Sequence, residues 1–494
     1  MYLLGLDIGS SSVKASIVDT KSKELISSAF YPPEEMPIDS AQPGFAEQDP
    51  EMWWKNALKA LQSACVQGGV EASGIEAIGI SYQMHGLVMV DENQKVLRKS
   101  IIWCDSRAVE IGNKAFENIG DSQCLSRVLN SPGNFTASKL KWVQENEEDI
   151  YKTAYKIMLP GDYIAMKLSG DIKTTKTGLS EGIMWDFQNE DVADLILDNY
   201  GISKDLIPEL APVFGIQSRV STVASAETGI PINAPISYRA GDQPNNALSL
   251  NVMKEGEVAA VAGTSGVIYA IQKDAQYDPL SRVNSFAHVN HENDDKSIGI
   301  LLCINGTGIL YSWLKKYVGQ NSMSYDEMNE AAKQVEAGCQ GLSILPFGNG
   351  AERVLKNEDP GAQILGVNFN THSSAHLFRA ANEGIAFSFK YGLDILADMG
   401  INPNVMRVGN ASMFQSALFR EIMANTLNIT IESYNTDGAL GAALAAGYGA
   451  GLYKSTDEAL SNLEVVHRTE PMPDELKKYE KAYQLWKERL QLFL

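Results

Sequence analysis

Two short polar turns interrupt apolar, strand-like runs of the chain and are the first candidates for chemistry. The first lies in GLDIGSSSVKASIVD, where residues 9–12 separate two apolar runs. The second, residues 263–266, divides GEVAAVAGTSGVIYAI in the same way. One such turn fits an ordinary hairpin as well as a phosphate-binding turn, in which backbone N–H groups and hydroxyls contact phosphate oxygens. Two of them, one in each half of the chain, favour a pair of turns that hold one polyphosphate.

Other well-known phosphate-binding motifs are missing from the sequence. It contains no G-x-x-x-x-G-K-[ST], and no G-x-G-x-x-G follows a strand-like run, which excludes a P-loop and leaves a dinucleotide fold without support. Since these motifs are missing, the two polar turns favour an architecture in which hairpins bind the phosphates.

The elements that must position the turns alternate between strand and helix. Asp49-Pro50 predicts the N-cap and first residue of a helix, and IEAIGISYQM predicts a buried strand that ends before His85. In the second half, residues 375–400 predict a long amphipathic helix ended by Gly400, and residues 438–451 a helix of small residues that must pack closely. This alternation predicts an α/β fold. We expect two domains, residues 1–245 and residues 246–494.

Composition narrows the function classes. A chain of 494 residues with 44% hydrophobic and 21% charged residues is typical of a globular protein with about two domains. Its net charge of −20 argues against a nucleic-acid partner and against an anionic membrane surface. The N-terminal apolar run has no basic segment before it and is broken at Asp7, so we expect a cytoplasmic protein. Five cysteines without a C-x-x-C pair predict reduced thiols.

The chain resembles the FGGY carbohydrate kinases in six motifs that occur in the order and spacing of that family. These are GLDIGSSSVK, WCDSR, NFTASKLKWVQEN, LPGDYIAMKLSG, AGDQPNNAL and GTSGVIY. The resemblance reaches to about residue 450, and SYQMHGLVMVD and SFAHV are most similar to the xylulokinase branch. It implies two RNase H-like domains of the actin and sugar-kinase ATPase type, with an active-site cleft between them.

Two aspartates receive catalytic roles from the resemblance. Asp242 in AGDQ would be the general base that accepts the proton of a sugar hydroxyl, since it follows the strand-like APISYRA. Asp7 would lie beside Mg²⁺ through a water molecule, because Mg²⁺ keeps much of its hydration shell. Considered without the resemblance, Asp242 reads as a turn residue and Asp7 as part of an Asx turn.

Sugar recognition would fall to residues near the ends of two buried runs. The resemblance implies contacts from Met84, His85, Trp103 and Asp105. A histidine at a strand end is often a satisfied core residue, and Asp105 with Arg107 also fits a local ion pair. The pairs His288/His291 and His372/His376 have no third ligand nearby in the sequence, so we assign no transition metal to them.

The nucleotide site would combine both polar turns with a later strand end. The residues implied are Ser10, Ser11, Ser12, Lys14, Gly263, Thr264, Ser265, Gly266, Gly409 and Asn410. Here the chain departs from the family in two segments: the glycine-rich segment is reduced to VGNAS, and the Gly-Glu-Arg segment is GAER. The change in the glycine-rich segment predicts that the purine is held loosely. The segment TTKTGLSEG, whose one acidic residue is Glu181, lacks the acidic residue that the family often carries there, which leaves the exact pentulose open.

The expected function is ATP- and Mg²⁺-dependent phosphorylation of a pentulose, with D-xylulose the first candidate. A kinase for ribulose or gluconate is the alternative within the class. A non-catalytic actin-type nucleotide switch is the alternative from another class, and it would have no need of Asp242 as a base. The expected partners are the sugar and ATP, and a homodimer is left open.

Overall fold

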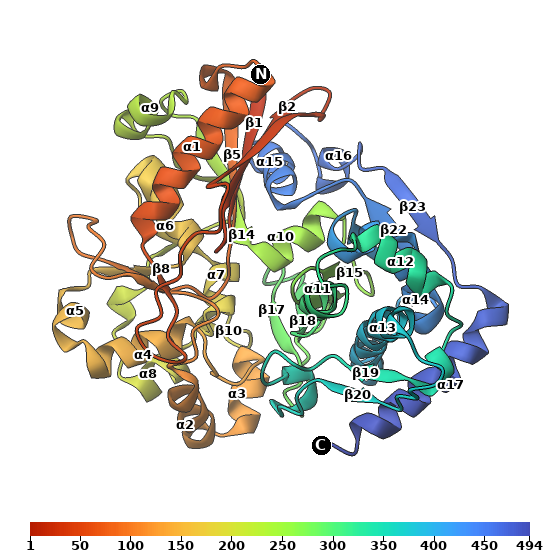
Figure 1. Cartoon of the computed structure of the whole chain (residues 1–494). Helices are drawn as coiled ribbons and strands as arrows, with labels where there is room; N and C mark the ends of the chain where they lie inside the picture. Colours follow the sequence, from red (N-terminus) through yellow and green to blue (C-terminus); the bar gives the residue numbers. More distant parts are fainter.

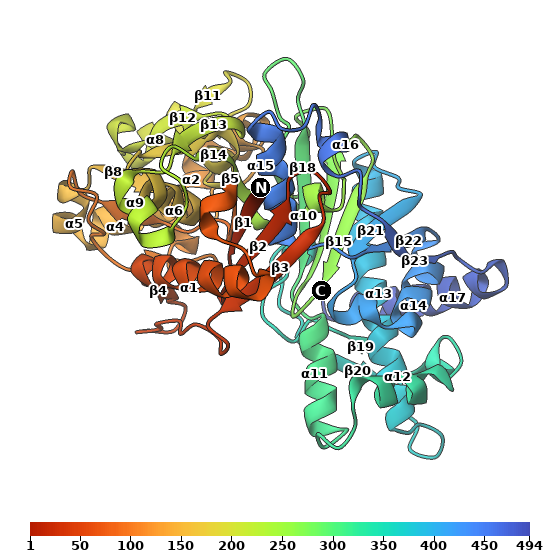
Figure 2. The same ribbon diagram turned by 90° about the horizontal axis from the view of Figure 1, so that it is seen from above.

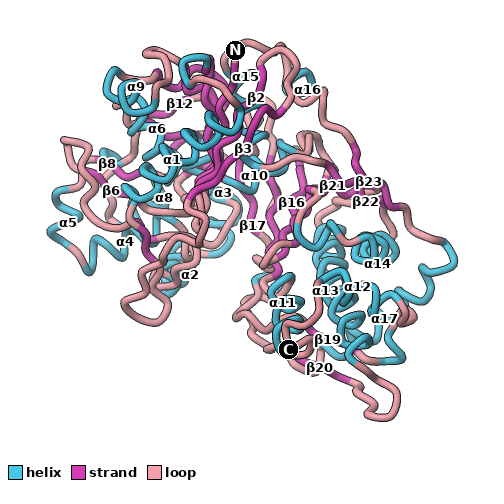
Figure 3. The backbone as a smooth tube through the Cα atoms, turned by 45° about the horizontal axis from the view of Figure 1, so that its top comes forward, coloured by secondary structure: helices cyan, strands magenta, loops and turns pink.

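The computed structural model describes all residues from Met1 to Leu494. Figure 1 shows two halves side by side, the N-terminal half in red to yellow and the C-terminal half in green to blue. Each half is built around one large mixed sheet. The tube in Figure 3 shows the two groups of strands, with helices around each.

The first sheet has six strands in the order β13-β14-β5-β1-β2-β3. Their bounds are β1 Tyr2–Ile8, β2 Val13–Asp19, β3 Leu25–Tyr31, β5 Ile75–Tyr82, β13 Phe214–Arg219 and β14 Pro235–Gly241. β1 is antiparallel to β2 and parallel to β5, so the predicted hairpin around residues 9–12 is present. β14 is parallel to β5, which brings the end of β14, just before Asp242, beside the end of β5.

The second sheet has seven strands in the order β17-β18-β16-β15-β21-β22-β23. Their bounds are β15 Val258–Ala262, β16 Gly266–Gln272, β17 Asn284–Ala287, β18 Ile298–Ile304, β21 Val405–Gly409, β22 Thr430–Tyr434 and β23 Val465–Thr469. β15 and β16 form the second predicted hairpin, and β15 is parallel to β21.

Both sheets repeat one pairing pattern. In the first, β3, β2 and β1 are antiparallel neighbours, β1, β5 and β14 are parallel neighbours, and β13 is antiparallel to β14. In the second, β18, β16 and β15 are antiparallel, β15, β21 and β22 are parallel, and β23 is antiparallel to β22. The second sheet adds β17 beside β18. The duplication expected from the two polar turns is therefore confirmed at the level of strand pairing.

Helices cover the faces of both sheets (Figures 1 and 2). Their bounds are α1 Pro50–Gly68, α2 Val109–Ile119, α3 Asp121–Val128, α4 Thr136–Asn146, α5 Glu148–Thr153, α6 Pro160–Ser169, α7 Lys176–Glu181, α8 Asp194–Tyr200, α9 Thr222–Thr228, α10 Asp242–Ser249, α11 Gly308–Tyr317, α12 Tyr325–Lys333, α13 Ser374–Asp398, α14 Ala417–Leu427, α15 Gly438–Gly449, α16 Thr456–Ala459 and α17 Pro473–Leu490. None of them combines the length and the apolar character needed to cross a membrane.

Short two-stranded sheets complete the fold. They are formed by β4 Glu47–Gln48, β6 Val88–Val90, β7 Ser100–Ile101, β8 Lys156–Met158, β9 Lys173–Thr175, β10 Trp185–Asp186, β11 Asp191–Val192, β12 Glu209–Ala211, β19 Ser343–Leu345 and β20 Gln363–Leu365. The helix ends follow the local signals. Asp49 caps α1 by accepting a hydrogen bond from the Glu51 backbone N–H at 3.0 Å.

The small-residue helix α15 comes from the C-terminal half and packs on the N-terminal sheet (Figure 1). A Cβ on Gly5 in β1 would come within 1.8 Å of the Ala439 carbonyl oxygen, and one on Gly79 in β5 within 2.0 Å of the Ala442 carbonyl oxygen. Glycines facing alanines thus allow the helix backbone to approach the sheet directly. The expected close packing of residues 438–451 is confirmed, and it fixes the start of α15 beside the end of β1.

Strand β17 provides a second contact between the halves. The Asn130 side chain donates to the Ser285 carbonyl at 2.6 Å and accepts from the Ser285 N–H at 3.0 Å. The Ser180 hydroxyl in α7 accepts from the Ala287 N–H at 2.9 Å. Residues of β17 therefore lie against the part of the N-terminal half that carries His85.

Candidate active site

Asp7 lies near the end of β1, where the two halves meet. Its Oδ1 accepts a hydrogen bond from the Ser81 hydroxyl on β5 at 2.9 Å. Its Oδ2 lies toward the start of α15, since a Cβ on Gly438 would come within 2.6 Å of it. Burial raises the pKa of Asp7 to about 6; Asp437 raises it further, whereas the hydrogen bond from Ser81 and the charge of Lys14 oppose the rise. A nearby cation would stabilise the charged form of a carboxylate in such surroundings.

Asp242 is the first residue of α10 and follows β14 directly. Burial raises its pKa to about 7, and the charge of Asp7 raises it further. The two predicted carboxylates are thus close enough to affect one another. A carboxylate whose pKa lies near neutral pH is suited to accept a proton from a hydroxyl group as a phosphoryl group arrives.

The first polar turn connects β1 to β2 and carries Lys14 opposite Asp7 in the strand register. The Lys14 ammonium forms an ion pair with Asp437 at 2.5 Å, rather than pointing freely to solvent. Asp437 is also the N-cap of α15 and accepts from the Leu440 N–H at 2.9 Å. The sequence left the direction of Lys14 open, and the structure places it at the start of α15.

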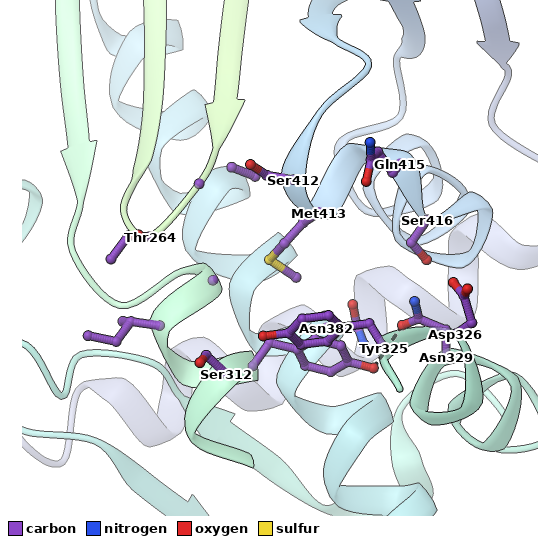
Figure 4. A pocket seen from close by; sticks show the side chains of 15 residues that line it. Thr264, Ser312, Tyr325, Asp326, Asn329, Asn382, Ser412, Met413, Gln415 and Ser416 are labelled. Carbon is purple, nitrogen blue, oxygen red and sulfur yellow. Dashed lines mark hydrogen bonds between the residues drawn. The ribbon is translucent and has the colours of Figure 1, made fainter. Parts of the chain in front are cut away.

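The second polar turn borders the larger of two adjoining cavities in the C-terminal half. The larger, of about 480 Å³, is lined by Gly263 and Thr264 at one end and by Tyr325, Asp326 and Asn329 at the other (Figure 4). In Figure 4 the Met413 side chain points into it from the side opposite Tyr325. Amide, hydroxyl and carboxylate groups together with aromatic rings make this cavity suitable for a nucleotide base.

The smaller cavity, of about 170 Å³, leads from the larger one toward Asp7. Both are lined by Ala262 and Ser412. The smaller is also lined by Gly409, Asp437 and Gly438, the last of which approaches Asp7. The two cavities therefore extend from a base-sized space to the start of α15, where Asp7 is close, and a nucleoside triphosphate would extend its phosphates in this direction.

Three predicted nucleotide residues of the C-terminal half, Ser265, Gly266 and Asn410, lie outside these cavities. Ser265 and Asn410 line neither of them, and the Asn410 N–H donates to the Tyr434 carbonyl at 2.7 Å. Gly266 is small for a packing reason, since a Cβ there would come within 2.6 Å of Thr307 and within 2.8 Å of Phe389. The segment after β21 that does reach the larger cavity, residues 412–416, begins beyond Asn410.

The first-turn serines have different surroundings from one another. The Ser10 carbonyl accepts from the Gln48 side chain at 2.7 Å, and the Ser11 carbonyl accepts from the Met36 N–H at 2.8 Å. The Ser12 carbonyl accepts from the Gly9 N–H at 3.1 Å and closes the turn. The carbonyls thus hold the turn in place, and of the three serines Ser11 is exposed while Ser10 and Ser12 are half-buried.

His85 adopts a backbone conformation that is rare for residues other than glycine, with φ of 63°. Its Nδ1 lies 2.9 Å from the Glu181 carbonyl oxygen, so Nδ1 carries the hydrogen and Nε2 is free to accept. Burial lowers the pKa of His85 to about 3, and Lys139 lowers it further, so the ring is neutral. Phe135 and Phe286 pack against the ring with centroids at 4.8 and 5.4 Å. The free acceptor suits a sugar hydroxyl.

Met84 and Glu181 lie between His85 and Asp242. Met84 packs on Gly241, the residue before Asp242, since a Cβ on Gly241 would come within 2.6 Å of the Met84 Cγ. The same Cβ would come within 2.9 Å of the Glu181 Oε2. Burial raises the pKa of Glu181 well above its usual range and the charge of Asp242 raises it further, which favours the neutral form of this buried carboxyl. Met84, His85 and Asp242 are therefore brought together.

Asp105 and Trp103 have other partners. The Asp105 carboxylate is buried, accepts from Arg107 Nη2 at 2.7 Å and from the Ala46 N–H at 2.6 Å. The local ion pair, one of two sequence interpretations, is therefore present, and a sugar contact from Asp105 stays a prediction. Trp103 is half exposed and its indole N–H donates to the Ser10 hydroxyl at 3.3 Å, which places it at the first polar turn.

Sequence reasoning missed several residues of this region although its motifs contain them. Lys139 lies in NFTASKLKWVQEN and donates to the His85 carbonyl at 2.9 Å and to the Ile102 carbonyl at 3.0 Å. Phe286 lies in SFAHV, and Glu181 in TTKTGLSEG. A motif identifies the segment, but only the folded chain shows which of its side chains faces the site.

Comparisons with known proteins agree with this architecture. Residues 2–249 match the N-terminal domain and residues 258–450 the C-terminal domain of the FGGY family of carbohydrate kinases. The xylulose kinase of Bacillus subtilis (strain 168) is 26% identical over 495 residues, covering 98% of this chain and 96% of that protein.

Solved structures share the fold over the whole chain. The xylulose kinase from Rhodospirillum rubrum has a TM-score of 0.88 at 24% identity, covering 100% of this chain and 99% of that one. The gluconate kinase from Lactobacillus acidophilus has a TM-score of 0.90 at 22% identity, covering 99% of this chain and 98% of that one. With both domain matches in sequence order on the two repeated sheets, the chain belongs to the FGGY family of carbohydrate kinases.

Proposed function

We propose that this sugar kinase transfers the γ-phosphoryl group of ATP to a pentulose, with D-xylulose as the substrate that we favour and Asp242 as the general base. The observation that carries the proposal is the position of Asp242, at the start of α10 between the Met84–His85 segment and the half-buried Asp7. Its raised pKa suits proton acceptance near neutral pH.

The reaction is an in-line displacement. Asp242 accepts the proton of the substrate's terminal hydroxyl, whose oxygen forms a bond to the γ-phosphorus. The bond between that phosphorus and the β,γ-bridging oxygen breaks, and ADP leaves with its electron pair. The division into residues 1–245 and 246–494 stays our prediction of the two bodies that close around the substrates, and closure would keep water from the reacting phosphate.

The residues around Asp7 fit Mg²⁺. The carboxylates of Asp7 and Asp242 are close enough for the charge of Asp7 to raise the pKa of Asp242, and hard oxygen ligands of this kind are those that Mg²⁺ prefers. Asp7 would hold the ion through a water molecule, and the bound ion would offset the charge that develops on the phosphates. Lys14 is paired with Asp437 and so supports the start of α15 in our proposal.

D-Xylulose is favoured because the Bacillus subtilis relative, matched over 98% of this chain, is a xylulose kinase. A gluconate kinase shares the fold, so an aldonate is the second candidate within the class. Ribulose is a further pentulose candidate. An actin-type switch without a sugar substrate is less favoured, because it gives Asp242 no task.

A coupled assay of ADP release over pentuloses, hexonates and polyols tests the substrate. We expect the highest kcat/KM for D-xylulose, and a higher value for gluconate would replace the pentulose assignment. Asp242→Asn should retain the binding of ATP and sugar but lower kcat by about two to four orders of magnitude. Turnover near that of the wild type in this variant would rule out Asp242 as the base.

A further inference from the structure

Arg353 crosses from the C-terminal half toward the residues around His85. It begins the short 3₁₀ helix η4, Arg353–Leu355. The residue before it is anchored, because the buried Glu352 carboxylate accepts from the Asn305 N–H with both oxygens, at 2.9 and 3.0 Å. The backbone that carries Arg353 is therefore fixed to the end of β18.

The Arg353 guanidinium has no carboxylate partner. Its Nη1 lies 3.3 Å from the Ser281 carbonyl and 3.4 Å from the Ser281 hydroxyl, and no ion pair of the chain includes it. Other buried arginines differ, since Arg239 lies 2.9 Å from the Asp162 carboxylate. A partly buried guanidinium with neutral neighbours loses hydration without gaining a counter-charge, which leaves its donors available to a ligand.

The free side of the guanidinium faces the N-terminal half. Its Nη2 lies 3.5 Å from the position of a Cβ on Gly133, and the edge of the Phe135 ring lies 3.3 Å from the same point. Phe135 packs against the His85 ring at 4.8 Å and against Phe286 at 5.9 Å. Arg353 is therefore next to the aromatic group that surrounds the free Nε2 of His85.

This region is at the opposite end of the proposed sugar position from the reacting hydroxyl. Asp242 accepts the proton at one end, and Met84 lies between Asp242 and His85. The planar donors of a guanidinium fit two oxygens held on neighbouring or shared carbons. A ketose offers such a pair in its C2 carbonyl and C1 hydroxyl, and an aldonate offers its carboxylate.

We propose, on the basis of the function proposed above, that Arg353 is a specificity-determining residue that binds the oxygen pair at the non-reacting end of the sugar. It does so together with Nε2 of His85. Because Arg353 belongs to the C-terminal half and His85 to the N-terminal half, the sugar would also hold the two halves together. A sugar without this oxygen pair should bind weakly and favour a separated arrangement of the halves.

The test compares Arg353→Met and Arg353→Lys with Lys356→Met. The control removes a positive charge from an exposed side chain three residues further along the same segment. For the best substrate of the wild type, we expect KM for the sugar to rise by about 10- to 100-fold in Arg353→Met, as for a lost hydrogen bond to a charged group. Arg353→Lys should be intermediate, and the Kd of ADP and the melting temperature should change little in all three.

A substrate analogue separates direct contact from a structural effect. 1-Deoxy-D-xylulose lacks one oxygen of the pair, so wild type should bind it much more weakly than D-xylulose, whereas Arg353→Met should discriminate between the two by less than about threefold. If gluconate is the better substrate, the same comparison uses gluconate and its neutral alditol.

Three results would contradict the inference. An unchanged sugar KM in Arg353→Met, or undiminished discrimination against the deoxy analogue, would overturn the role of Arg353 and leave the sugar-kinase proposal intact. A wild-type protein that phosphorylates no sugar of the panel would overturn both proposals together.

Discussion

The contact between Gly438 and Asp7 gives a direct test of the site geometry. Gly438 is the first residue of α15, and a Cβ at this position would lie 2.6 Å from the Asp7 Oδ2. Helix α15 is anchored on the sheet, because moving it away would open the packing of its Ala439 and Ala442 carbonyls on Gly5 and Gly79. In Gly438→Ala the Asp7 carboxylate must therefore move, while the backbone stays.

The size of this movement sets the expected effect. Ordinary contact begins at about 3.4 Å, so Asp7 Oδ2 must shift from 2.6 Å by about 0.8 Å. A misplacement of about 1 Å at a reacting group can lower the rate about 100-fold, so we expect kcat/KM to fall by about 10- to 100-fold. Stability should change by less than about 1 kcal/mol, because alanine is the better helix former and the obstacle is the end of a flexible side chain.

Gly447→Ala on the same helix is the matched control. Its Cβ would meet Tyr453 at 2.4 Å and Leu3 at 2.9 Å, well away from the carboxylates. Overpacking there should cost about 1–3 kcal/mol of stability and leave the activity of the folded enzyme unchanged. Thermal melts and initial rates are measured on both variants. Wild-type kcat/KM in Gly438→Ala would show that the reaction does not depend on the position of the Asp7 carboxylate beside α15.

Three further predictions concern the substrate sites. Because the pKa of Asp242 is raised to about 7 and the base must be unprotonated, kcat/KM should fall about tenfold per pH unit below pH 7, and a flat profile from pH 5.5 to 8 would refute this assignment. His85→Ala should weaken sugar binding by about 1–3 kcal/mol and leave ATP binding unchanged in calorimetric titrations; the opposite pattern would remove His85 from the sugar site. GTP and ITP should support kcat/KM within about tenfold of ATP, since Asp326 and Asn329 offer acceptors and donors for either purine, and a thousandfold preference for ATP would contradict a loosely held base.

The fold followed from local patterns in the sequence. Apolar runs broken by polar turns predicted the two hairpins, and Asp49-Pro50 predicted the start of α1, because strand alternation and helix capping depend on neighbouring residues alone. The small residues of α15 predicted close packing. They did not reveal its partner, since Gly5 and Gly79 lie hundreds of residues away in the chain.

The chemistry of the site depended on the tertiary structure. The type and place of Asp242 in the sequence suggested a base, but burial and the proximity of Asp7 raise its pKa, and both arise only when the sheets assemble. For Asp105 the sequence allowed either a sugar contact or an ion pair. In the folded chain its carboxylate accepts hydrogen bonds from Arg107 and from the Ala46 N–H. Arg353 lies next to Ser281, Gly133 and Phe135, which are neutral and far from it in the sequence. The residues next to Arg353 in the chain therefore do not show whether its charge has a counter-ion.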